Sequence, residues 1–190
     1  VMFEEQQGSF LAGALAALVT RDPELRTRLF EYSKAVGFAP SPFDCWLLLR
    51  GVKTIELRVA KHCQNAMAVA QYLAQHPKVS RVNYPGLPTH AGHEIAKRQM
   101  KAFGGMVSFE VAGGVEAAAR VAEATKIFML AESLGGVESL LGYPAMMSHA
   151  ALSDDERMRR GIPPTLLRLS VGIENEADLI ADLDQALAKA

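Results

Sequence analysis

The clearest pattern of apolar and polar positions lies near the C-terminal end, where residues 166–174 read LLRLSVGIE. Leu167, Leu169 and Val171 alternate with positions that include Arg168, and a period of two places successive side chains on opposite faces of a strand. The pattern therefore predicts a strand with one apolar face and a guanidinium on the other. It leaves two roles open for that guanidinium: binding an anion through its planar fork, or meeting water or an internal carboxylate.

Apolar periodicity along the rest of the chain predicts further strands near residues 79–84, 107–111 and 127–131. Helices are expected from Asp22 to about Lys34, around 43–50, from 55 to Pro77, and over 115–124, 154–160 and 175–187. Residues 8–20 are small and apolar and fit either one or two buried strands or a buried helix. This order predicts an α/β fold, with a sheet of about four strands, helices mainly on one side, and a long helix leading into it.

Two short segments carry candidate chemistry. His90 and His93 have the spacing of a metal-binding pair, but Gly92 lies between them and no acidic or Cys partner sits at ligand spacing, so a helix entrance is favoured and no metal site is predicted. Ser133 is followed by glycines in ESLGGVESL. It either caps a helix or presents its hydroxyl and nearby backbone N–H groups to an anion.

Composition narrows the class of protein. The chain has 190 residues, is 49% hydrophobic and carries a formal net charge of −1, so it can bury a core and gives no electrostatic reason to expect a nucleic acid or a membrane as partner. Its two cysteines, Cys45 and Cys63, form no metal-type pair and suit a reducing compartment. The apolar run from Phe10 to Val19 is too short to span a membrane.

Five collinear motifs, from about residue 37 to the end, resemble the Cys/Met-metabolism family of pyridoxal-phosphate (PLP) enzymes. This family includes cystathionine γ-synthase, cystathionine γ- and β-lyases, methionine γ-lyase and homoserine sulfhydrylases. The motifs are SPFDCWLLLRGVKT (41–54), YPGLPTHAGHEIAKRQM (84–100), FGGMVSFE (103–110), AESLGGVESL (131–140) and LLRLSVGIE (166–174).

The resemblance implies a fold-type I enzyme whose C-terminal α+β domain holds a small, mostly antiparallel sheet, assembled as a cytoplasmic homotetramer of two dimers. It implies that Arg168 binds the substrate α-carboxylate and that Ser133, with Leu134 beside it, helps to hold the same group. Glu132 would lie near the substrate side chain, and its carboxylate would favour cystathionine or a homoserine ester over methionine. In the segment Met147-Ser148-His149, Ser148 takes the place of the family's usual threonine.

The sequence departs from the family's pattern at its beginning. The family's Schiff-base lysine precedes a glycine-rich apolar stretch like GSFLAGALAALVT, yet residues 1–7 contain no lysine and the first one is Lys34. We therefore expect residues 1–50 to be the end of the large cofactor domain and 51–190 the C-terminal domain. In that case upstream residues hold the PLP, this chain carries neither the catalytic lysine nor a cofactor contact, and it is inactive alone. The alternative is a non-catalytic relic that serves as a structural or partner-binding domain.

Overall fold

The structure is a computed structural model that describes residues 20–36 and 41–190. The chain divides into two compact units, Val1–Thr54 and Ile55–Ala190. In the first unit, helices α2 (Pro23–Val36) and α3 (Pro42–Val52) both begin at a capped proline start. Asp22 Oδ1 accepts from the backbone N–H groups of Glu24 and Leu25. These bonds confirm the predicted helix start. The stretch 8–19 lies outside the described residues.

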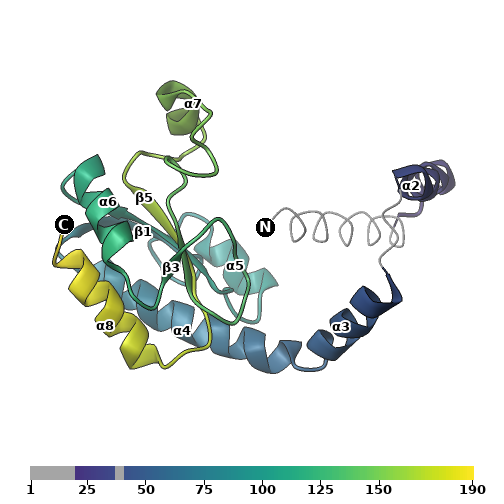
Figure 1. The fold of residues 1–190 in the computed structure, drawn as a ribbon, viewed down its shortest axis with the longest axis horizontal. Helices are drawn as coiled ribbons and strands as arrows, with labels where there is room; N and C mark the ends of the chain where they lie inside the picture. Colours follow the sequence, from purple (N-terminus) through teal and green to yellow (C-terminus); the bar gives the residue numbers. More distant parts are fainter. Residues whose placement is uncertain (1–19, 37–40) are drawn as a thin grey trace. The chain divides into compact units, whose positions relative to one another are not determined.

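The second unit is built on a five-stranded sheet with the order β1-β2-β5-β4-β3 (Figure 1). The strands are β1 (Val79–Asn83), β2 (Met106–Val111), β3 (Met129–Leu130), β4 (Leu140–Gly142) and β5 (Leu166–Ser170). Neighbouring strands pair antiparallel except β3 and β4, which are parallel. The expected small, mostly antiparallel sheet is therefore confirmed.

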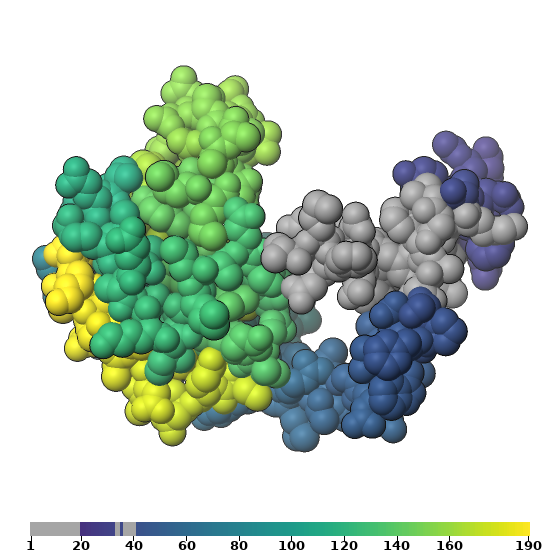
Figure 2. Space-filling view, viewed as in Figure 1, coloured from purple at the N-terminus to yellow at the C-terminus, as the bar shows by residue number. Residues whose placement is uncertain are grey.

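Five helices accompany this sheet in the described part of the second unit. They are α4 (Ile55–Gln75), α5 (His93–Gln99), α6 (Val115–Ala124), α7 (Asp154–Arg159) and α8 (Glu176–Leu187). Helix α7 has no buried residue and stands out from the rest of this unit in Figures 1 and 2. Helix α5 begins at His93 after Gly92, as the sequence around the two histidines predicted.

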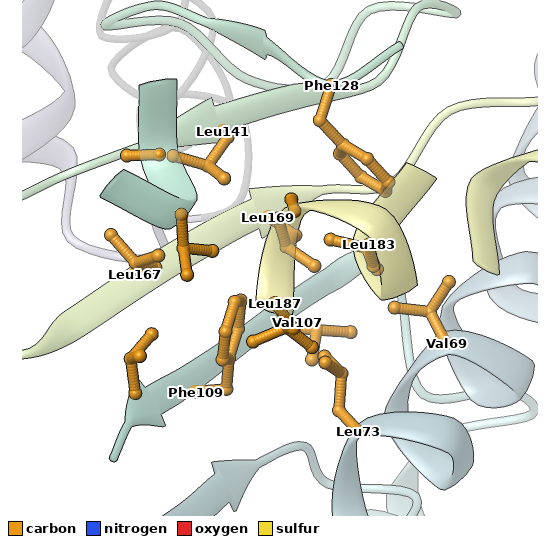
Figure 3. Close-up of a cluster of buried hydrophobic side chains, with 14 of the residues drawn as sticks. Val69, Leu73, Val107, Phe109, Phe128, Leu141, Leu167, Leu169, Leu183 and Leu187 are labelled. Carbon is orange, nitrogen blue, oxygen red and sulfur yellow. The ribbon is translucent and has the colours of Figure 1, made fainter. Parts of the chain in front are cut away.

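The core lies between one face of the sheet and helices α4, α6 and α8 (Figure 3). Phe109 of β2 is opposite Leu167 of β5, and Leu169 is opposite Leu141 of β4, so these side chains share one face. All four have no solvent exposure. Burying a side chain of this size stabilises a fold by about 1.5–3 kcal/mol, so the alternation in β5 fixes which face of the sheet the helices cover.

The opposite face of the sheet carries polar side chains near its centre and at one edge. Because pairing places partners on the same face, Arg168 of β5 shares it with Ser108 of β2 and Gly142 of β4. At the edge of this face, Arg81 and Glu110 form a cross-strand ion pair of 3.9 Å. Ser170 lies two residues beyond Arg168 on the same strand and the same face. The sheet therefore separates a helix-covered apolar side from a side that carries an unusual central arginine.

Three sequence predictions need correction. Strand β4 was not predicted, because three residues show too little alternation to be recognised. The strand expected over 127–131 is reduced to Met129–Leu130, since the N–H groups of residues 126–128 donate to the Asp182 carboxylate instead of a ladder. No helix follows Ser133 in the described residues, so its role as a helix cap is excluded.

Candidate functional site

Arg168 occupies the middle of the sheet. Its strand lies between β2 and β4, and the residue is half-buried between Leu167 and Leu169, which are fully buried. The guanidinium reaches over β4 at Gly142, where a Cβ would lie 3.5 Å from Nη2 and 3.7 Å from Nε. The glycine leaves open the space through which the arginine side chain extends toward residues 131–133.

Few of the N–H donors of this guanidinium have an acceptor among the described residues. Its Nη2 donates to the backbone oxygen of Ser133 at 3.5 Å, which is at the long limit of a hydrogen bond. Among the ion pairs of residues 20–36 and 41–190, none includes Arg168. A guanidinium has five N–H donors, and a partly buried charge is normally paired. Of the roles left open by the sequence, pairing with an internal carboxylate is therefore excluded within the described residues.

The loop that carries Glu132, Ser133 and Leu134 is fastened to β5 and its continuation at several points. Besides the Arg168–Ser133 contact, the N–H of Gly135 donates to Ser170 Oγ at 2.8 Å. The N–H of Ile173 donates to the oxygen of Val137 at 2.9 Å. The loop thus lies against the Arg168 side of the sheet, and every second loop residue from 133 to 137 contacts β5 or its continuation.

A buried polar cluster secures the far end of this loop. The Glu174 carboxylate accepts from the N–H of Ser139 at 2.6 Å and from its hydroxyl at 2.9 Å. The Ser139 hydroxyl in turn accepts from the N–H of Gly172 at 2.8 Å. From α4, the Asn65 amide donates to the oxygens of Gly172 and Glu174, and His62 Nδ1 lies 2.6 Å from the oxygen of Val171. These bonds connect α4, the end of β5 and the loop into one unit.

The other predicted site residues are exposed. Glu132 and Leu134 are exposed on the loop. Ser148 is exposed as well, and its hydroxyl lies 2.8 Å from His149 Nδ1. The segment that carries Ser148 begins at Tyr143, whose hydroxyl donates to the oxygen of Pro164 at 2.7 Å, and burial raises the pKa of this phenol. Arg168 and Ser133 are thus in contact, whereas the described contacts do not bring Ser148 to them.

The candidate metal pair has other partners. His93 Nδ1 lies 2.8 Å from the oxygen of Pro85, and His90 Nδ1 accepts from the N–H of Gly92 at 3.0 Å. Within the described ranges there is no group of three His, Cys, Asp or Glu side chains that could hold a metal ion. Those ranges also include no helix whose length and apolar character would allow it to cross a membrane.

Comparisons with known proteins place this geometry in a family. Residues 7–188 match the family model described as "Cys/Met metabolism PLP-dependent enzyme". The chain belongs to this family. It is 51% identical over 175 residues to a cystathionine gamma-lyase of Dictyostelium discoideum, a match that covers 92% of this chain and 45% of that protein. It is 52% identical over 171 residues to a cystathionine gamma-synthase of Mycobacterium tuberculosis, covering 90% and 43% of the two chains.

The fold agrees with that membership. A crystal structure of cystathionine gamma synthase from Xanthomonas oryzae pv. oryzae, in complex with aminoacrylate and cysteine, has a TM-score of 0.83 and 47% identity to this chain. The match covers 90% of this chain and 44% of that one. The chain therefore spans less than half the length of the relatives it matches. The resemblance noted in the sequence is confirmed.

The family is PLP-dependent, which raises the question of which groups here suit the cofactor. The arginine, the serine and the backbone groups around Arg168 are suited to a single carboxylate. Within the described residues, the hydrogen bonds and ion pairs of Arg168 involve no lysine, ring-stacking residue or pyridine-nitrogen partner. These groups therefore suit a carboxylate, and they include neither an amine for a Schiff base nor a partner for the pyridine ring.

The sequence patterns missed most of the residues that hold the loop. Ser170 could have been found, because the alternation places it on the Arg168 face of β5. Glu174, Ser139 and Asn65 could not be recognised from local sequence, since their partners lie 33 to 109 residues away. Only the folded chain shows that they belong to the site.

Proposed function

We propose that this chain is the C-terminal portion of a PLP-dependent transsulfuration enzyme of the cystathionine γ-synthase, cystathionine lyase or homoserine sulfhydrylase type, and that it binds the substrate α-carboxylate. The supporting observation is that Arg168 is half-buried and that its guanidinium has no carboxylate partner in the described residues. An amino-acid carboxylate supplies the missing charge. Family membership makes such a substrate the natural occupant.

The proposed role follows from the geometry of the two groups. A guanidinium and a carboxylate form two parallel hydrogen bonds, which fix the orientation of the carboxylate as well as its position. The Ser133 segment borders the same space and limits how the amino acid can turn. PLP, when bound, supplies the electron sink for chemistry at Cα. The contribution of Arg168 is to hold the amino acid in the orientation that this chemistry requires.

The test is the substitution Arg168→Lys in the complete, PLP-loaded protein that contains this sequence. Lysine keeps the charge but loses the fork. The loss of a charge-assisted bidentate pair corresponds to about 2–4 kcal/mol, or roughly 30- to 1000-fold in kcat/KM. Cofactor content should not change. Arg81→Lys is the matched control, because Arg81 lies at the edge of the same sheet in an exposed ion pair. An Arg168→Lys variant that matches this control in kcat/KM excludes the role.

Substrate preference is proposed to depend on Glu132. Its carboxylate lies on the loop beside Ser133 and is exposed, with no ion pair among the described residues. A free carboxylate near the substrate side chain favours a polar or cationic distal group, as in cystathionine, over the thioether of methionine. Comparing kcat/KM for cystathionine, O-succinyl- or O-acetylhomoserine and methionine tests this preference. If methionine is the best substrate and Glu132→Val leaves the ranking unchanged, the proposal is wrong.

The remaining proposals concern the state of the protein. We propose that the complete protein is a cytoplasmic homotetramer in which upstream residues hold the PLP. Cys63 is a buried free thiol, as suits a reducing compartment. The 190-residue chain alone should therefore retain no PLP absorbance after desalting, whereas the complete protein should retain it. Native mass measurement of the complete protein tests the tetramer.

A further inference from the structure

We propose that Ser170 is a positioning residue for the carboxylate site: its hydroxyl holds the loop that presents Ser133 to the ligand of Arg168. This inference rests on the proposed function and adds a residue to it. Ser170 is buried, lies on the same strand face as Arg168, and accepts from the N–H of Gly135 at 2.8 Å. Gly135 is two residues after Ser133, so the bond acts on the segment that lines the site.

The reason for a side-chain anchor is the position of β5 in the sheet. From Arg168 to Ser170 this strand is paired with β2 on one edge and β4 on the other. Its backbone groups are therefore engaged in the two ladders and are not available to a loop that lies on the face of the sheet. Only side chains can hold such a loop there. Beyond the strand, where the ladders have ended, a backbone group can hold the loop: the N–H of Ile173 donates to the oxygen of Val137.

The two side-chain anchors differ in strength. The Arg168–Ser133 bond is 3.5 Å long, whereas the Ser170–Gly135 bond is 2.8 Å. The shorter bond is the one that fixes the loop near the site, and it leaves the arginine fork available to the ligand. Gly135 adopts φ +82, a conformation that favours glycine. The turn that brings its N–H to Ser170 is therefore one that few other residues would form.

This arrangement predicts a specific effect of removing the hydroxyl. Ser170→Ala deletes one acceptor and almost no volume, so the sheet and the Arg168 fork stay in place. The loop then loses its nearest fixed point to Ser133. We expect KM for the amino-acid substrate to rise roughly 3- to 10-fold, the factor that corresponds to one neutral hydrogen bond. We expect kcat and PLP content to change little, because ground-state binding is what weakens.

The experiment compares four variants of the complete, PLP-loaded protein by steady-state kinetics with cystathionine and by hydrogen exchange of peptides that cover residues 132–137. Ser80→Ala is the matched control, since it removes the same group and one hydrogen bond, to Glu110 O at 3.2 Å, on the edge strand. Ser170→Cys keeps a weak acceptor of similar size and should be intermediate between wild type and Ser170→Ala. It also carries the comparison if the alanine variant does not fold. Arg168→Lys reports on the carboxylate site itself.

The outcomes separate the two claims. Faster exchange at 132–137 together with a raised KM in the Ser170 variants, but not in Ser80→Ala, supports the positioning role. If Arg168→Lys lowers kcat/KM while the Ser170 variants behave like Ser80→Ala in either measurement, the positioning role is overturned and the carboxylate site stands. If Arg168→Lys leaves kcat/KM unchanged, the proposed carboxylate site is itself refuted, and with it the role of Ser170.

Discussion

Replacing Glu174 by glutamine tests the buried polar cluster that closes the far end of the loop. In the native structure both carboxylate oxygens accept from Ser139, one from its N–H at 2.6 Å and one from its hydroxyl at 2.9 Å. An amide offers only one acceptor. The Ser139 hydroxyl oxygen accepts from the N–H of Gly172 at 2.8 Å, and its second lone pair can accept from the new NH2 group. Its own hydrogen is then left without an acceptor in a fully buried position.

The expected cost follows from these bonds. One charge-assisted bond is lost and the other becomes neutral, which together cost about 2–4 kcal/mol. At about 2–4 °C per kcal/mol, the scale for a domain of 150–250 residues, that corresponds to a fall in Tm of roughly 4–16 °C. Thermal unfolding followed by circular dichroism measures the shift in the complete protein. Glu138→Gln is the control, because it removes an exposed carboxylate from the same loop. A Tm for Glu174→Gln within 2 °C of that control, on the scale of about 2–4 °C per kcal/mol, would refute the reasoning.

Three further predictions concern stability. Gly172→Ala should abolish folding or lower Tm by roughly 6–12 °C, the effect of about 3 kcal/mol of overpacking, because its Cβ would lie 2.3 Å from Val137 O. Soluble yield and Tm measure this. Asp182→Ala should cost about 3–5 kcal/mol in denaturant unfolding, since the carboxylate accepts three backbone N–H groups of residues 126–128. Burial raises the pKa of Tyr84 to about 12 from 10.0. Its neutral form therefore stabilises the fold, and this stability is lost as the pH rises from 10 to 12; Tyr84→Phe should flatten the fall of Tm over that range.

The sequence predicted the parts of the site that depend on local pattern. The alternation in LLRLSVGIE placed Arg168 on a strand and away from the apolar side, and both hold in the structure. Capping residues located helix starts: Asn175 Oδ1 accepts from the N–H of Ala177 at the start of α8. Such features depend on residues within one or two turns of each other, so the sequence contains the information needed to predict them.

The α4 helix shows where local pattern fails. Apolar residues three or four positions apart along this helix begin with Ile55 and Val59, a spacing typical of a buried helix face. Both are nevertheless 48% exposed, whereas His62 and Asn65 are buried. These two polar side chains are buried because the end of β5 presents backbone oxygens to them at residues 171–174. Hydrogen bonding compensates for the loss of water around a polar group. The α4 sequence alone does not predict a hydrogen-bond partner that lies more than 100 residues away.

The most direct test of the central claim pairs the arginine with the group it is proposed to bind. Cystathionine and its analogue with the α-carboxylate on the reacting side converted to a carboxamide are compared as substrates for the complete wild-type protein and for Arg168→Lys. The account predicts that wild type prefers the carboxylate by about 30-fold or more in kcat/KM, the effect of a charge-assisted bidentate pair. In Arg168→Lys this preference should fall several-fold toward equality. The same preference in both proteins would show that Arg168 does not bind the α-carboxylate.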